Sequence, residues 1–389
     1  MVTRRRESGA VSLFLVIFAM ILITVVTLSF LRVMIKDQSA SSVNDLSQSA
    51  YDSALAGTED AKRQLIYYRT LCNSGDASAC ATVRTTINST ECNQGLKDVV
   101  AVPSGQETLI QQSQSVANAD LSLNQAYTCV KMNLDTPDYL GVADANVSKL
   151  IPLTTTNNFT SVTVQWFTTE DLGASTKTVN LLSNSAPSKP LYLQTSWPSN
   201  RPSLLRAQLI QFGSGFKVSD FDTSNTINSN TNTIFLYPTG NTGSTSTFND
   251  TVDIASRDIR KTATGSPQAI HCVGLLSAGG YACSVTLNIP EAIGQTDSSR
   301  TAYLRLTPLY SGTHFRVSFS DPVVDFKGVQ PSIDSTGRAN TQYRRISTRV
   351  DLTNTNFAYP EAAIDVTGNL CKDFLVTDSS ADFVDACTP

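Results

Sequence analysis

The strongest constraint on this chain is an apolar segment close to its N-terminus. Residues 10–31 have the sequence AVSLFLVIFAMILITVVTLSFL, without any charged residue, glycine or proline. As a helix rising about 1.5 Å per residue, this segment is roughly 33 Å long, which is the thickness of the hydrocarbon core of a bilayer. The sequence therefore predicts a single transmembrane helix over residues 10–31.

The charges around this segment predict its orientation. Arg4, Arg5 and Arg6 precede it, and Arg32 and Lys36 follow it. Basic residues close to a span favour a cytoplasmic location for that flank. We therefore expect a single-pass protein of the cytoplasmic (inner) membrane, with its N-terminus inside and the bulk of the chain exported.

A cleaved secretory signal peptide is an alternative interpretation of the same segment. The apolar region of such a peptide usually spans about 7–15 residues and is followed by a cleavage site with small residues. Here the run is longer, it ends in Leu31-Arg32, and only a poor cleavage site follows near residues 39–41. These features favour a membrane anchor.

Helical periodicity continues beyond the apolar segment, over residues 32–70. Apolar or small residues recur there at steps of three or four, which is the period of an α-helix: Val43, Leu46, Ala50, Ala54, Gly57, Ala61, Leu65 and Tyr68. The first proline is Pro103, so we expect one helix from about residue 10 to about residue 70, roughly 90 Å long. Its small residues would let it lie close to a sheet or another helix, and Glu59 and Arg63 should form an i,i+4 pair.

The cysteines support export. All eight follow the apolar segment: Cys72, Cys80, Cys92, Cys129, Cys272, Cys283, Cys371 and Cys387. Disulfides persist in oxidising compartments, although their connectivity does not follow from sequence alone. Short separations favour Cys272–Cys283 and Cys371–Cys387, and in the first group we predict Cys72–Cys80 and Cys92–Cys129. A metal site is the weaker alternative, because the chain has no C-x-x-C and only two histidines, His271 and His314.

Composition argues against nucleic-acid binding. Charged residues make up 16% of the chain, against roughly 25% in an average soluble protein. The net charge is −4, and the basic residues beyond residue 6 are scattered rather than clustered in a stripe. Many serine, threonine and asparagine residues take the place of charges, which is typical of extracellular β-rich folds.

The exported part is expected to be mainly β-structure. We predict a cysteine-containing region of helix and loops over residues 71–150, a β-rich domain over 151–361 and a C-terminal disulfide loop over 362–389. Alternating apolar residues predict half-buried strands at 161–167, 204–212, 233–237, 284–289, 302–309, 315–319 and 344–351. The fold class is α+β, with the long N-terminal helix packed on a disulfide-containing, mainly antiparallel β domain. Residues 71–389 could form one exported domain or two, and both alternatives remain open.

No constellation in the sequence indicates catalysis or a cofactor. The chain has no G-x-S-x-G, no H-E-x-x-H and no P-loop. Asp220 and Asp222 resemble the start of a calcium loop, but Asn225 and Thr231 stand where that loop needs glycine and glutamate. We therefore expect no enzyme, no cofactor and no metal, with this pair as a weak calcium candidate.

The first residues carry a family resemblance. Arg4-Arg5-Arg6-Glu7-Ser8-Gly9, followed by Ala10 and the apolar run, resembles the class III prepilin leader of type IV pilin-like proteins. The resemblance implies that residues 1–9 are a leader, cut between Gly9 and Ala10 by a prepilin peptidase, with methylation of the new N-terminus. The helix would then serve first as a membrane anchor among lipids and later as a filament core that contacts other pilins.

The chain also departs from the pattern of major pilins. These usually have phenylalanine at the first mature position and glutamate at the fifth, where this chain has Ala10 and Phe14. Members without the glutamate are typically minor pilins, and this opening looks most similar to the PilX type. The resemblance covers residues 1 to about 70 and implies a subunit at or near a filament tip, for assembly initiation or for adhesion to a surface or host ligand.

Two other functions remain open. One is an uncleaved, single-pass surface adhesin without a filament, and the other is a secreted hydrolase with an unrecognised site. Loss of filaments on deleting the gene would separate the pilin-like function from the adhesin.

Overall fold

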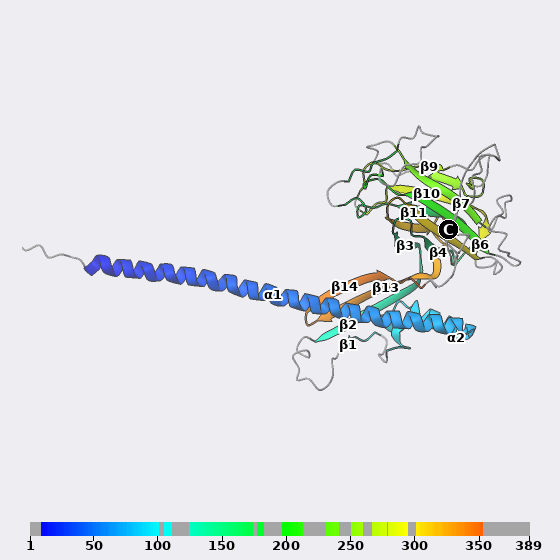
Figure 1. Ribbon diagram of the computed structural model, residues 1–389. Coiled ribbons are helices and arrows are strands. Elements are labelled where there is room, and N and C mark those ends of the chain that lie inside the picture. Colours follow the sequence, from blue (N-terminus) through cyan, green and yellow to red (C-terminus); the bar gives the residue numbers. More distant parts are fainter. Residues whose placement is uncertain are drawn as a thin grey trace, which may run out of the picture.

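A computed structural model gives the fold and describes residues 9–100, 105–110, 124–173, 177–182, 197–212, 231–240, 250–259, 267–277, 279–294 and 301–352. Figure 1 shows three parts: a long helix, a sheet that lies on the second half of that helix, and a pair of larger sheets. The predicted α+β class, with an apolar N-terminal helix on a mainly antiparallel, disulfide-containing β structure, is confirmed.

The N-terminal helix, α1, spans Gly9–Asn73, so the single helix expected over residues 10–70 is confirmed. Its 65 residues make it about 97 Å long. A shorter helix, α2 (Ala77–Ile87), and a 3₁₀ turn (Gln94–Leu96) follow. The carboxylate of Asp76 accepts a hydrogen bond from the backbone of Ala79 at 2.9 Å and so caps α2.

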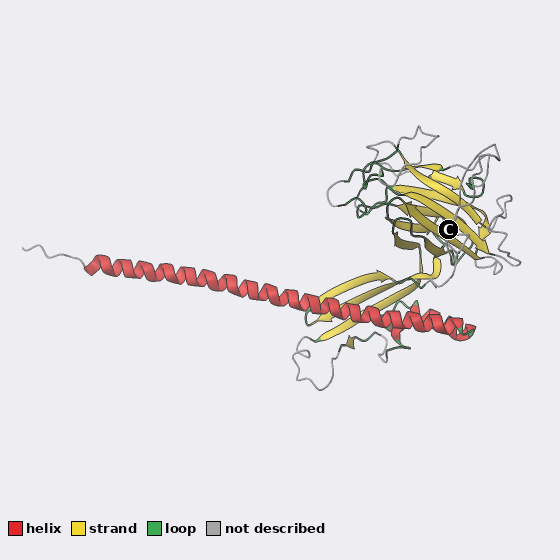
Figure 2. Cartoon of the chain, viewed as in Figure 1, coloured by secondary structure: helices red, strands yellow, loops and turns green. Residues whose placement is uncertain are grey.

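A four-stranded antiparallel sheet covers the second half of α1 (Figure 2). Its strand order is β1 (Thr108–Leu109), β2 (Gln125–Thr136), β13 (Phe326–Ala339) and β14 (Gln342–Arg349). We call this sheet, together with α2 and residues 46–73 of α1, the stem. The stem has a hydrophobic core of its own, formed by α1, α2, β2 and β13.

The expectation of helix and loops alone over residues 71–150 is wrong. Residues 125–136 form the long strand β2, and β3 and part of β4 also lie in this region. In β2 the apolar Val130, Met132 and Leu134 alternate with polar residues, which is the period of a half-buried strand.

Two five-stranded sheets form the second unit, which we call the sandwich. One sheet has the order β3 (Asp138–Ala143), β12 (Thr313–Phe319), β5 (Phe159–Trp166), β10 (Cys283–Ile293), β8 (Asp250–Asp253). The other has the order β4 (Lys149–Pro152), β11 (Thr301–Leu309), β6 (Leu204–Phe212), β7 (Thr231–Thr239), β9 (Gln268–His271). Neighbours are antiparallel except β8 with β10 and β7 with β9. Both sheets contribute to one hydrophobic core. Of the seven strands expected from alternation, six lie in these two sheets, and the seventh, at 344–351, is β14 of the stem.

The sandwich is an insertion between two neighbouring strands of the stem sheet. β2 ends at Thr136 and β3 begins at Asp138, while β12 ends at Phe319 and β13 begins at Phe326. The chain therefore leaves the stem at Pro137, before the expected boundary at residue 150, and re-enters it through residues 320–325.

The described residues contain three disulfides: Cys72–Cys80, Cys92–Cys129 and Cys272–Cys283. These are the pairs predicted from their positions in the sequence. No described cysteine is free. Cys371 and Cys387 lie outside the described residues.

Candidate membrane and assembly interface

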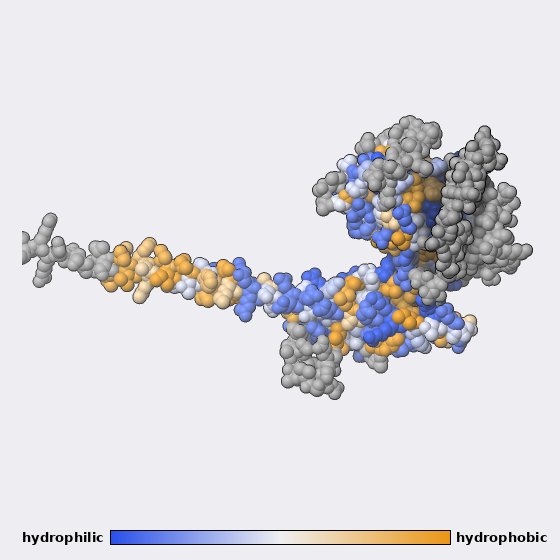
Figure 3. Space-filling model, in the orientation of Figure 1, coloured by the Kyte–Doolittle hydropathy of each residue, from blue (hydrophilic) through white to orange (hydrophobic). Residues whose placement is uncertain are grey.

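The first half of α1 presents apolar side chains on all sides. Its large apolar residues from Leu13 to Ile35 are all exposed, with Leu13 at 64% and Phe14 at 76%. Figure 3 shows this half as a mostly apolar rod that projects from the rest of the protein. By length and composition the helix can cross a membrane once. It is therefore compatible with a single-pass membrane anchor.

The hydroxyl groups inside this apolar segment are satisfied within the helix. Thr24 and Thr27 donate to the carbonyl oxygens of Met20 and Ile23, each at 2.7 Å, and Ser29 donates in the same way to the carbonyl four residues before it, at 2.8 Å. An unsatisfied hydroxyl is costly in an apolar medium, whereas this local bond removes the need for water. The segment thus suits lipid or the apolar surfaces of other helices.

The second half of α1 contacts the stem sheet through small side chains. Its buried positions are Ala50, Ser53, Ala54, Gly57, Thr58, Ala61, Gln64 and Leu65. The predicted small-residue stripe is thus confirmed from residue 50 onward, whereas Val43, at its expected start, is exposed. α1 contacts β13, β14 and β2 through this half.

Two glycines bring the helix and the sheet unusually close. A Cβ added at Gly337 in β13 would lie 2.2 Å from the carbonyl oxygen of Ala50 and 2.2 Å from the backbone nitrogen of Ala54. A Cβ added at Gly57 would lie 2.6 Å from the hydroxyl of Ser335. The same hydroxyl donates to the carbonyl oxygen of Ala54 at 2.7 Å, so a side chain of β13 bonds to the backbone of the helix.

Polar contacts flank this interface. The hydroxyl of Tyr127 in β2 donates to Asp60 at 2.9 Å, and burial raises the pKa of Tyr127 to about 12. The prediction of an ion pair between Glu59 and Arg63 is wrong. Arg63 instead pairs with Asp60 at 3.0 Å, and Glu59 pairs with Lys62 at 2.6 Å. Both pairs are three residues apart, a spacing that also brings side chains together on a helix.

The predicted processing site lies where the described chain begins. Gly9 and Ala10 are the first two residues of α1. Arg4, Arg5 and Arg6 lie outside the described residues, as do the calcium candidates Asp220 and Asp222.

Both histidines contact carboxylates. Nδ1 of His271 lies 3.0 Å from Asp250. Nδ1 of His314 lies 2.7 Å from Asp171, and its Nε2 lies 3.0 Å from Glu170. Within the described part of the chain, no three His, Cys, Asp or Glu side chains gather in a way that would hold a metal ion.

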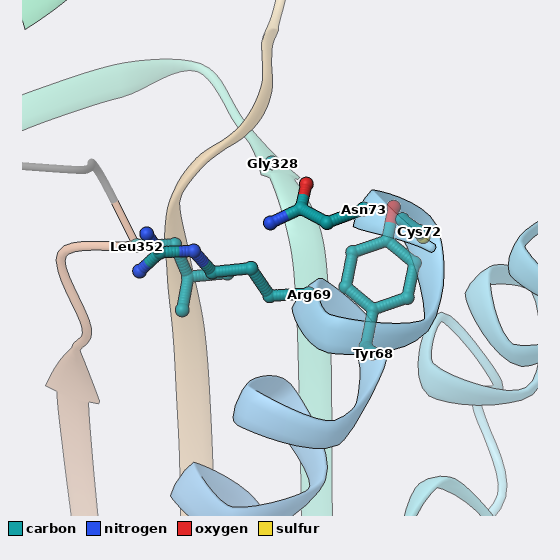
Figure 4. Close-up of a pocket in the computed structure, with 6 residues that line it drawn as sticks. All are labelled: Tyr68, Arg69, Cys72, Asn73, Gly328 and Leu352. Atoms are coloured by element: carbon teal, nitrogen blue, oxygen red, sulfur yellow. The ribbon is translucent and has the colours of Figure 1, made fainter. Parts of the chain in front are cut away.

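One open pocket of about 320 Å³ lies at the end of α1 (Figure 4). It is lined by Tyr68, Arg69, Cys72, Asn73, Gly328 and Leu352. Cys72 is in a disulfide, and the phenol oxygen of Tyr68 accepts a hydrogen bond from Arg84 at 3.2 Å. This lining offers no pair of nucleophile and general base, so we assign it no chemistry.

Comparison of the chain with models of protein families, with curated proteins and with solved structures found no match. The resemblance of the N-terminal residues to pilin-like proteins therefore rests on the leader and the helix alone.

Proposed function

We propose that this chain is a minor pilin-like structural subunit of a type IV pilus or a related filament. It is inserted into the cytoplasmic membrane as a precursor and cut after Gly9 by a prepilin peptidase. It then assembles through α1 and holds its sandwich outward, at or near the tip, for assembly initiation or adhesion. Its role is structural, with other pilins as its partners.

The division of α1 into two halves carries this proposal. The docked half is fixed to the stem sheet from Ala50 to Leu65, whereas the residues from Leu13 to Ile35 are apolar and exposed. Soluble proteins rarely expose an apolar patch larger than a few hundred Å². The exposed half thus requires an apolar partner, which lipid supplies before assembly and neighbouring helices supply afterwards.

The side chain at the fifth mature position supports a place at or near the tip. Phe14 occupies that position and is 76% exposed. No carboxylate lies between Leu13 and Leu31, so this span cannot attract the N-terminal amine of a neighbouring subunit. A subunit that lacks this contact suits a position where assembly begins.

The experiment is to determine the N-terminus of the full chain extracted from membranes, by intact mass and N-terminal sequencing. We expect a chain that begins at Ala10 in cells with a prepilin peptidase and a chain with residues 1–9 in cells without it. Gly9→Val should keep the leader, while the matched control Ser8→Ala should be cut normally. Retention of Arg4 to Gly9 in the native host would refute the proposal.

An uncleaved, membrane-anchored surface adhesin is the second candidate, because the sandwich is a large separate unit that filament assembly alone does not require. This protein would keep residues 1–9. Deletion of its gene would reduce attachment of cells to a surface without any loss of filaments, whereas deletion of a subunit that initiates assembly would reduce both.

A further inference from the structure

The stem and the sandwich meet at a cluster of polar side chains close to the two chain crossings. The chain crosses between the units at Pro137 and again through residues 320–325. The end of β14 lies close to these crossings and contacts the sandwich. We call this cluster the joint. Its members are Asp138, Tyr139, Gln330, Arg349 and Asp351.

Asp138 is the first bridging residue of the joint. It is the first residue of β3 and is only 8% exposed. One of its carboxylate oxygens lies 2.8 Å from Arg316 of β12, within the sandwich, and the other lies 2.8 Å from Arg349 of β14, in the stem. One sheltered carboxylate is thus shared between arginines of the two units, which fixes its position from both sides.

Asp351 makes the reciprocal connection from the stem. The hydroxyl of Tyr139, a side chain buried in the sandwich core, donates to Asp351 at 2.7 Å, and Lys149 of β4 lies 3.1 Å from the same oxygen. Burial, reinforced by Asp351 itself, raises the pKa of Tyr139, so the phenol remains a donor. Hydrogen bonds from the backbone of Val350 and Leu352 to the carbonyls of β13 hold Asp351 in place.

Gln330 completes the joint by pairing with the edge of the sandwich. It belongs to β13 and is 6% exposed. Its amide nitrogen donates to the carbonyl of Leu140 at 2.7 Å, and the backbone nitrogen of Leu140 donates to its amide oxygen at 2.9 Å. The side chain therefore satisfies both backbone groups of one residue on edge strand β3, as a neighbouring strand would.

We propose that the joint fixes the sandwich in one orientation relative to α1. Phe326, at the start of β13, packs against Phe319 and Tyr139 in the sandwich core, and the polar contacts of the joint add directional bonds to this apolar contact. The contacts of Asp138, Gln330 and Asp351 lie beside the crossings and connect the stem to the sandwich at three separate points. This inference does not depend on the proposed function, because an anchored adhesin would use the same joint.

Single-molecule energy transfer on the full chain in nanodiscs tests the joint. Dyes are attached through non-natural amino acids at Ile66, an exposed residue of α1, and at Thr251, an exposed residue of β8. The unaltered joint should give one narrow distribution of transfer efficiency. The double variant Arg349→Gln/Asp351→Asn should lose the narrow peak and give a broad or split distribution.

Two further variants keep the test decisive. Arg345→Gln is the matched control, because Arg345 also belongs to β14 but pairs with Asp334 inside the stem sheet; it should leave the narrow peak unchanged. If the double variant does not fold, Tyr139→Phe removes a single hydroxyl from the joint and should broaden the peak. The proposal is overturned if the native chain is already as broad as the variants, or if the folded joint variants stay as narrow as Arg345→Gln.

Discussion

Gly337→Ala tests whether the close approach of β13 to α1 holds the stem together. The added methyl group would lie 2.2 Å from two backbone atoms of the helix, where an ordinary contact is at least 3.4 Å. Helix and sheet must therefore separate by about 1.2 Å, because backbone atoms cannot rotate away as a flexible side chain can.

The cost follows from what this separation breaks. Overpacking of a buried interface costs about 1–3 kcal/mol. The hydrogen bond from Ser335 to the carbonyl of Ala54, 2.7 Å long, would be stretched beyond bonding distance, which adds about 1 kcal/mol. We therefore expect the free energy of unfolding to fall by about 2–4 kcal/mol and the melting temperature of the stem by roughly 5–15 °C.

Thermal melting of the full chain in detergent, followed by circular dichroism, measures this loss. Thr336→Ala is the control, because it alters the neighbouring residue of β13, whose side chain leaves the strand on the opposite face from position 337. Hydrogen exchange adds a local readout, since the amides of α1 around Ala54 should exchange faster only in the Gly337 variant. Unchanged melting together with unchanged exchange would show that the interface tolerates the methyl group, and our account of the helix–sheet contact would be wrong.

Three further predictions concern the disulfides, the phenol of Tyr127 and position 14. Replacing Cys92 and Cys129 by serine should cost about 4 kcal/mol, and replacing Cys72 and Cys80 about 2.5 kcal/mol, because the loops span 37 and 8 residues; equal losses in urea unfolding would contradict the loop argument. Burial raises the pKa of Tyr127 from 10 to about 12, so its stabilising effect is complete below pH 10 and disappears as the pH rises towards 12; urea unfolding of Tyr127→Phe should show a flatter loss over that range. On the proposed function, Phe14→Glu would supply a carboxylate at the fifth mature position and should move the proposed subunit from filament ends into the shaft, as seen by immunogold labelling; labels that stay at the ends would argue against the role proposed for this position.

Those parts of the fold that depend on local periodicity could be predicted from the sequence. α1 follows from an apolar segment joined to a three-and-four spacing, and six strands of the sandwich follow from alternation, whereas the short strands β3, β4, β8 and β9 were not predicted. β13 escaped prediction because Gly328, Pro331 and Gly337 interrupt it, and at Gly337 the glycine is present because the helix backbone lies against it. Gly337 thus weakens the strand pattern in the sequence, but the close contact between β13 and α1 requires a glycine there.

The joint could not be predicted at all. Asp138 and Arg349 are 211 positions apart, and Tyr139 and Asp351 are 212 apart. Neither pair forms part of a motif, and a charged residue at the start of a strand ordinarily indicates a solvated edge. Only the insertion of the sandwich between β2 and β13 brings these residues together.

The disulfides of the stem have a mechanical consequence for a protein that is anchored at one end and pulled at the other. Tension between α1 and the sandwich is transmitted through the Cys72–Cys80 disulfide to α2 and along the chain to Cys92. From there it passes through the Cys92–Cys129 disulfide into β2. Residues 73–79 and 93–128 are bypassed by the two bonds. If both bonds were open and these residues were fully extended, the chain between α1 and the sandwich would be longer by roughly 150 Å. With the bonds closed, a pull on the sandwich reaches α1 with little stretching of the chain between them.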